Sequence, residues 1–121
     1  MLEAISHIAL VVKDPARTAA LFHDLFGARA VEREDEEGHV ETFVRLAGTW
    51  IVLVGAPVER ARTGDHIAFR ATPEILKATA AKLQAMGREF IMARSGRALY
   101  FFDCDDHVFE LDTEDIDSKL G

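Results

Sequence analysis

Three residues with metal-binding side chains occur at related places in the chain. His7 opens the run His-Ile-Ala-Leu, His66 opens the similar run His-Ile-Ala-Phe, and Glu110 lies in a third apolar run. Successive side chains of a strand point to opposite faces, so Glu110 points away from Phe109 and Leu111, and each histidine alternates with bulky residues in the same way. A lone histidine on a strand is more often a hydrogen-bonded surface or core residue. Two equivalent histidines and a carboxylate instead predict a divalent metal site with positions open for water or substrate.

The strands that carry these residues belong to an internal repeat. Each histidine run is followed by a polar residue and a proline, Asp-Pro in the first half and Thr-Pro in the second, which suit the start of a helix. Each predicted helix ends at a glycine, Gly27 or Gly87, and three strand-like runs follow. These runs are residues 28–33, 40–46, 49–54, 88–92, 98–102 and 107–112.

The repeat predicts an α+β fold of two βαβββ modules that form a concave mixed sheet. The modules are expected at residues 1–57 and 64–113, followed by a tail of residues 114–121. The helices are expected to bury one apolar stripe each, formed by Leu21, Phe22, Leu25 and Phe26 and by Ile75, Leu76, Thr79, Leu83 and Met86.

Length and charge narrow the class of protein. The chain has 121 residues, with 14 Lys+Arg against 21 Asp+Glu, and its net charge is −7. One domain is expected at this length, and the acidity argues against a nucleic-acid partner. No apolar run approaches the roughly 20 residues of a membrane span, and the first residues do not resemble a signal peptide. With one cysteine, Cys104, the expected location is the cytoplasm, with no membrane partner.

The segment from residue 98 to residue 111 carries the most specific motif. It contains Tyr-Phe-Phe-Asp-Cys-Asp-Asp-His-Val-Phe-Glu, which resembles the signature Tyr-Phe-x-Asp-x-Asp-x-His-x-x-Glu of fosfomycin resistance proteins. Ser6-His7 and Asp65-His66 fit the same family, and the resemblance covers the whole chain. The sequence is therefore similar to the vicinal oxygen chelate superfamily (glyoxalases, bleomycin resistance proteins and extradiol dioxygenases), and within it to FosX-type proteins.

This resemblance implies a metal-dependent epoxide hydrolase that adds water to fosfomycin or a related small epoxide or phosphonate. The implied metal is Mn²⁺, although the same ligands suit Fe²⁺, Ni²⁺ or Zn²⁺. The implied ligands are His7, His66 and Glu110. The resemblance also implies a domain-swapped homodimer in which His7 of one chain joins His66 and Glu110 of the other.

Five further residues are expected at the site through the same resemblance. Glu41 is the candidate base that takes a proton from the attacking water, and Tyr100 matches the family's active-site tyrosine. The candidate cations for the phosphonate are Arg94, Arg97 and Lys119.

Three positions near the expected phosphonate site differ from the usual family residues: Ala9, Gly64 and Phe90. Weaker phosphonate binding is expected from these differences.

Alternative functions remain open at this point. Aligning the two halves places Val52 where the first module would have a second carboxylate, and glyoxalase I typically uses a fourth protein ligand there. A glyoxalase-like isomerase or lyase, an extradiol dioxygenase and a non-catalytic small-molecule-binding resistance protein are the alternatives. The last of these is disfavoured by the complete set of three candidate ligands.

Overall fold

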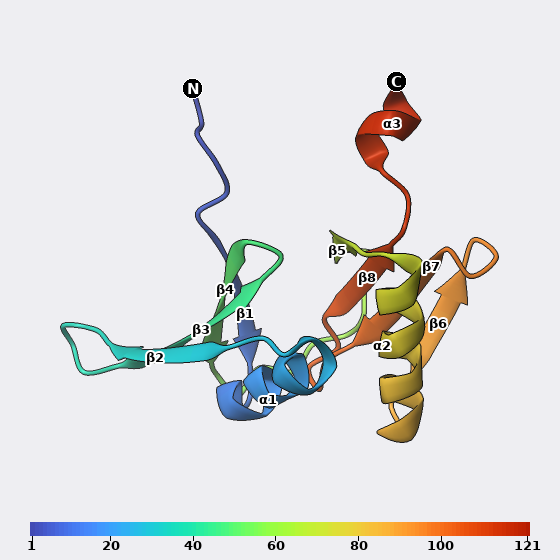
Figure 1. Ribbon diagram of the computed structural model, residues 1–121. Helices are drawn as coiled ribbons and strands as arrows, with labels where there is room; N and C mark the ends of the chain where they lie inside the picture. Colours follow the sequence, from blue (N-terminus) through green and yellow to red (C-terminus); the bar gives the residue numbers. More distant parts are fainter. The chain divides into compact units, whose positions relative to one another are not determined.

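The computed structural model describes residues 1–121 and contains the βαβββ order twice (Figure 1). The first module consists of β1 (His7–Val12), α1 (Pro15–Phe26), β2 (Ala30–Glu34), β3 (Val40–Leu46) and β4 (Thr49–Gly55). The second consists of β5 (His66–Arg70), α2 (Pro73–Ala85), β6 (Phe90–Ala93), β7 (Ala98–Phe102) and β8 (Val108–Asp112), and a short helix α3 (Ile116–Leu120) follows. The chain divides into two compact units, Met1–Glu59 and Arg60–Gly121. The predicted repeat is confirmed, and each unit has its own sheet.

Both long helices begin as the sequence predicts. The side chain of Asp14 accepts a hydrogen bond from the backbone N–H of Arg17 at 3.2 Å, and Thr72 accepts one from Ile75 at 3.2 Å. A proline occupies the first turn of each helix, where its missing N–H costs nothing. None of the three helices has the length and apolar character needed to cross a membrane.

The two helices end in similar ways. Gly27 caps α1 with a left-handed backbone (φ 68°), and Gly87 adopts the same region (φ 67°) two residues after α2 ends. The N–H of Arg88 reaches the carbonyl of Leu83 at 2.9 Å, which satisfies an otherwise free carbonyl of the last turn. Glycine is needed at both places because a Cβ disfavours this conformation.

Each sheet buries one face against its own helix. Leu21, Phe22 and Leu25 of α1 are buried, together with Ile51 and Leu53 of β4. In the second module the same arrangement buries a set of aliphatic and aromatic side chains, namely Leu76, Leu83, Leu99, Phe101, Phe109 and Leu111. The predicted stripe of α2 is wrong at its two ends, because Ile75 and Met86 are 48% and 40% exposed.

The strand order is the same in both sheets: β1-β4-β3-β2 and β5-β8-β7-β6. The first strand of each module pairs in parallel with the last, and the other pairs are antiparallel. Ala9 is paired with Val52 in the first sheet, and Ala68 is paired with Glu110 in the second. This matched register confirms the alignment of the two halves and fixes Val52 as the counterpart of Glu110.

Candidate functional site

His66 and Glu110 lie together on the face of the second sheet that α2 does not cover. Nε2 of His66 is 3.1 Å from Oε1 of Glu110. The two residues come from neighbouring parallel strands, β5 and β8, and the strand register places His66 beside Val108, two residues before the glutamate. Glu110 is only 4% exposed, so its charge requires partners that compensate for lost hydration.

The arrangement of His66 suits a metal ligand. Its Nδ1 lies 2.9 Å from the carbonyl oxygen of Gly64. A carbonyl only accepts, so Nδ1 is the donor of this bond, and the tautomer that donates from Nδ1 has its lone pair on Nε2. Metal-binding histidines are commonly oriented by such a bond to a backbone carbonyl. The lone pair of Nε2 and a carboxylate oxygen therefore converge, and this donor set fits a divalent cation.

Arg94 is the second partner of Glu110. One of its terminal guanidinium nitrogens donates a hydrogen bond to Oε2 of Glu110 and lies 3.4 Å from a carboxylate oxygen of Asp112. The hydrogen bond with Glu110, and then one with Tyr100, raise the pKa of Arg94 above its ordinary value. The two oxygens of Glu110 thus have different neighbours, His66 at Oε1 and Arg94 at Oε2.

A tight turn after β6 delivers Arg94 to this position. Arg94 and Ser95 have φ angles of 49° and 57°, a left-handed backbone that costs a non-glycine residue roughly 1–2 kcal/mol. The turn is closed by a hydrogen bond from the N–H of Gly96 to the carbonyl of Ala93 at 3.1 Å. The ion pair with a buried carboxylate is an interaction that offsets this strain.

Tyr100 lies beside the same pair. Its ring meets the ring of His66 edge to face, with centroids 5.6 Å apart. On β7 it is paired with Glu110 of β8. The predicted residues His66, Glu110, Tyr100 and Arg94 are therefore neighbours within the second module.

The first module places His7 and Glu41 around one cavity. The cavity has a volume of about 520 Å³. It is lined by Ser6, His7, Val31, Arg33, Glu41, Phe43, Trp50 and Val52. Nδ1 of His7 is 3.0 Å from the hydroxyl oxygen of Ser6. The structure thus brings the candidate base and one candidate ligand together on the open face of the first sheet.

The two other predicted cations, Arg97 and Lys119, both lie beside Glu114. Arg97 is 3.3 Å from Glu114, and Lys119 of α3 is 3.6 Å from the same residue. Their side chains are 61% and 57% exposed. Their assignment to phosphonate binding stays a prediction.

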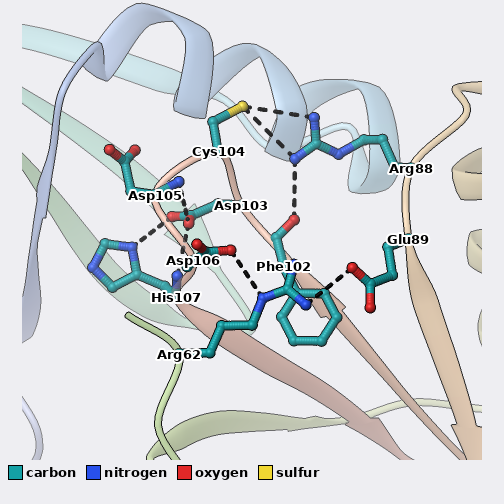
Figure 2. Close-up of polar contacts among 9 residues, drawn as sticks. All are labelled: Arg62, Arg88, Glu89, Phe102, Asp103, Cys104, Asp105, Asp106 and His107. Atoms are coloured by element: carbon teal, nitrogen blue, oxygen red, sulfur yellow. Dashed lines mark hydrogen bonds and ion pairs between the residues drawn. The ribbon is translucent and has the colours of Figure 1, made fainter. Parts of the chain in front are cut away.

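A cluster of charged residues anchors the strands that carry His66 and Glu110 (Figure 2). Arg62 donates hydrogen bonds to Asp106 and Glu89, each at 2.9 Å, and its guanidinium lies 3.5 Å from the centre of the Phe102 ring. Arg62 precedes His66 by four residues, and Asp106 precedes Glu110 by four. This contact therefore ties together the segments that lead into β5 and β8.

Within the same cluster, Asp103 and His107 form a buried pair. Oδ2 of Asp103 is 2.7 Å from Nδ1 of His107, and Oδ1 accepts hydrogen bonds from the backbone N–H groups of Asp105 and His107, each at 2.9 Å (Figure 2). These bonds fix the turn between β7 and β8. They account for the first Asp of the motif, Asp103, and for its His, His107, as residues that fix the turn leading into the last strand.

Sequence reasoning missed two residues of these sites, Arg33 and Arg62. Arg33 could have been found, because strand alternation puts it on the same face as Val31 and opposite Glu41. Arg62 gave no local signal, since its partners Glu89 and Asp106 are 27 and 44 residues away.

Comparisons with known proteins agree with this architecture. The profile of the Glyoxalase/Bleomycin resistance protein/Dioxygenase superfamily matches residues 4–111. The chain is 30% identical over 128 residues to the fosfomycin resistance protein FosX of Listeria innocua, an alignment covering 99% of this chain and 96% of the relative. It is 28% identical over 129 residues to FosX of Mesorhizobium japonicum, with coverages of 100% and 93%.

A solved structure is similar over the full length of both chains. It is a mutant of FosX from Listeria monocytogenes complexed with Mn(II) and 1S,2S-dihydroxypropylphosphonic acid, and it matches with a TM-score of 0.87, 32% identity and 100% coverage of each chain.

The chain therefore belongs to the glyoxalase/bleomycin resistance protein/dioxygenase superfamily. Within that superfamily it is a homologue of the FosX fosfomycin resistance proteins.

Proposed function

We propose that this protein is a metal-dependent hydrolase that adds water across the epoxide of fosfomycin or of a related small phosphonate. The observation that carries the proposal is the convergence of His66 Nε2 and Glu110 Oε1 at 3.1 Å. The homology with FosX adds support, because a FosX structure contains both Mn(II) and a dihydroxypropylphosphonate. A vicinal diol is the product expected from adding water to an epoxide.

His66, Glu110 and His7 would hold the metal, with Mn²⁺ as the proposed ion. His7 occupies in the first module the position that His66 occupies in the second, since each opens the first strand of its module. The ligands then come from both modules. We assign His7 to one chain and His66 with Glu110 to the other chain of a homodimer.

A divalent metal held by these residues would supply a Lewis acid that stabilises the negative charge formed as the epoxide opens. Glu41 takes a proton from the attacking water while the water oxygen forms a bond to one epoxide carbon. The carbon–oxygen bond of the epoxide breaks, and its electron pair stays on the epoxide oxygen, which takes up a proton. Glu41 then releases its proton, and the net reaction is the addition of one water molecule.

The remaining predicted residues bind the substrate. The Tyr100 hydroxyl is suited to donate a hydrogen bond to a substrate oxygen beside the metal ligands. Arg94, Arg97 and Lys119 are the predicted cations for the anionic group. Arg94 also has an orienting role, because its hydrogen bond to Oε2 of Glu110 leaves Oε1 directed toward His66.

A glyoxalase-like isomerase is less well supported. Val52 is paired with Ala9 as Glu110 is paired with Ala68. A valine side chain has no donor atom for a metal, so a fourth protein ligand is missing at this position.

The proposal is tested by incubating the Mn²⁺-loaded protein with fosfomycin and following the ³¹P NMR spectrum, with and without glutathione. We expect slow conversion to the diol in both samples. Ala9, Gly64 and Phe90 replace the residues usual in the family, and weaker phosphonate binding is expected from these replacements. Conversion only with glutathione, or no conversion with any divalent metal, would contradict the proposed reaction.

The proposed homodimer has a separate test. Sedimentation at micromolar concentration is expected to give about twice the chain mass of 13.4 kDa. A monomer that binds metal with full affinity would exclude the swapped arrangement.

A further inference from the structure

The cavity of the first module contains one strongly basic side chain. Arg33 is the only lysine or arginine in its lining, where it accompanies His7 and Glu41. The other lining residues are mostly apolar and aromatic. A cation in a largely apolar cavity is a specific feature, since few other groups there interact with an anion.

The strand register explains why Arg33 faces the cavity. In the antiparallel pair of β2 and β3, Arg33 stands opposite Glu41 and Val31 stands opposite Phe43. Directly opposite residues share a face, and their Cβ atoms lie about 4.5–5.5 Å apart. Glu32 and Glu34, the neighbours of Arg33 in sequence, belong to the other face.

Arg33 differs from the other cations near the proposed site because its guanidinium has no ion-pair partner in the structure. Arg94 is bonded to Glu110, and Arg97 and Lys119 both lie beside Glu114. Arg45, on the same face as Arg33, lies over the ring of Trp50 at 5.0 Å from its centre. Among these cations, Arg33 can bind an anion without first losing an ion pair or a contact with an aromatic ring.

We infer that Arg33 binds the anionic group of the substrate, a phosphonate or a chemically equivalent tetrahedral oxyanion. The planar guanidinium donates paired hydrogen bonds to two oxygens of such a group. It also offsets the repulsion between the incoming anion and the carboxylate of Glu41 on the neighbouring strand. This inference rests on the proposed function, in which Glu41 and the substrate meet in this cavity.

The test uses methylphosphonate, which has the anionic group but no epoxide. Its binding to the Mn²⁺-loaded protein is measured by calorimetry for the parent, Arg33→Met and Arg33→Lys. We expect Arg33→Met to weaken binding by about 10- to 100-fold, the range for losing a hydrogen bond to a charged group. Arg33→Lys is expected to lose less, because it keeps the charge and loses only the paired geometry.

Arg17→Met is the matched control, because Arg17 lies on α1 outside the cavity lining and the substitution removes the same charge. Equal affinity in the parent and Arg33→Met, an equal loss in Arg17→Met, or no binding by the parent would each overturn the inference. If methylphosphonate binding depends on Arg33 but fosfomycin is not hydrolysed, the proposed reaction fails and the anion site stands. If fosfomycin is hydrolysed with an unchanged KM in Arg33→Met, the reaction stands and the anion site fails.

Discussion

The two modules share a scaffold and differ in the chemistry of their open faces. In the second module, Glu110 is buried, its Oε1 lies beside His66, and its Oε2 is paired with the guanidinium of Arg94. In the first module the equivalent position is Val52, and the polar residues Glu41 and Arg33 line an open cavity without a mutual ion pair. In the proposed function, the second face supplies two of the metal ligands. The first face supplies the third ligand, His7, together with the proposed base Glu41 and the guanidinium of Arg33.

The largest effect is expected from Glu41→Gln in the first module. The variant keeps the size of the side chain and loses the proton acceptor, so fosfomycin turnover is expected to fall by about 10²- to 10⁴-fold. Mn²⁺ affinity should stay at the parent value, because Glu41 is not a proposed ligand. Full turnover measured by ³¹P NMR would remove Glu41 from the mechanism, and the first module would then not supply the base.

Glu110→Gln in the second module is expected to act on the metal instead. It removes one of three proposed ligands, so Mn²⁺ affinity should fall by about 100-fold or more, at least the loss seen on removing outer-shell partners. Titration followed by the electron paramagnetic resonance signal of free Mn²⁺ gives the affinity. Val52→Ala is the control at the equivalent position and should bind Mn²⁺ as the parent does. A loss of Mn²⁺ affinity in Val52→Ala would contradict the claim that only the second module has a ligand at this position.

The two modules can also be compared for stability, because each contains an aspartate in a similar turn, Asp35 in the first and Asp103 in the second. Asp103 and Asp35 each accept hydrogen bonds from two backbone N–H groups and contact the histidine four residues later. The side chain of Asp103 is fully buried, whereas that of Asp35 is 35% exposed. Asp103→Ala is therefore expected to lower the free energy of unfolding by about 2–4 kcal/mol, since buried donors lose a charged acceptor.

Urea denaturation measures both variants. Asp35→Ala should destabilise the protein much less than Asp103→Ala, because water replaces the lost acceptor at an exposed turn. Equal losses would mean that burial does not decide the contribution of this motif.

The smallest effect is expected from Tyr100→Phe. The strand register makes Phe43 of the first module the counterpart of Tyr100, since they are paired with Val52 and Glu110 respectively. The substitution removes only the hydroxyl, so kcat/KM for fosfomycin is expected to fall about tenfold, the lower end of the range for losing one hydrogen bond to a charged group. Stopped-time ³¹P NMR assays give this ratio, and an unchanged value would exclude a substrate contact by the hydroxyl.

Much of the scaffold could be predicted because its signals are local. The capping residues, the prolines and the alternation of strand residues act over a few positions, and the predicted strands start within two residues of the observed ones. The exposed side chains of Ile75 and Met86 show the limit of this approach. A periodic stripe marks the buried direction of a helix but does not define how far the sheet covers its edges.

The site was only partly predictable, because its contacts depend on distant segments. The grouping of His66 with Glu110 followed from the repeat and from strand alternation. The hydrogen bond from Arg94 to Glu110 did not, since it depends on a left-handed turn that holds a non-glycine residue. The position of Glu41 was also uncertain from spacing alone, because a one-residue shift reverses the face of a strand. The continuous pairing of β3 with β2 and β4 places it on the cavity side without a bulge.

The most direct test of the central claim is fosfomycin turnover in H₂¹⁸O, with the product analysed by mass spectrometry. Addition of water predicts a dihydroxypropylphosphonate that carries one ¹⁸O atom. The Mn²⁺-loaded parent is expected to form it without glutathione, and Glu41→Gln is expected to form it about 10²- to 10⁴-fold more slowly. An unlabelled product, a product that forms only as a glutathione adduct, or the same labelled product from Glu41→Gln at the parent rate would contradict the account.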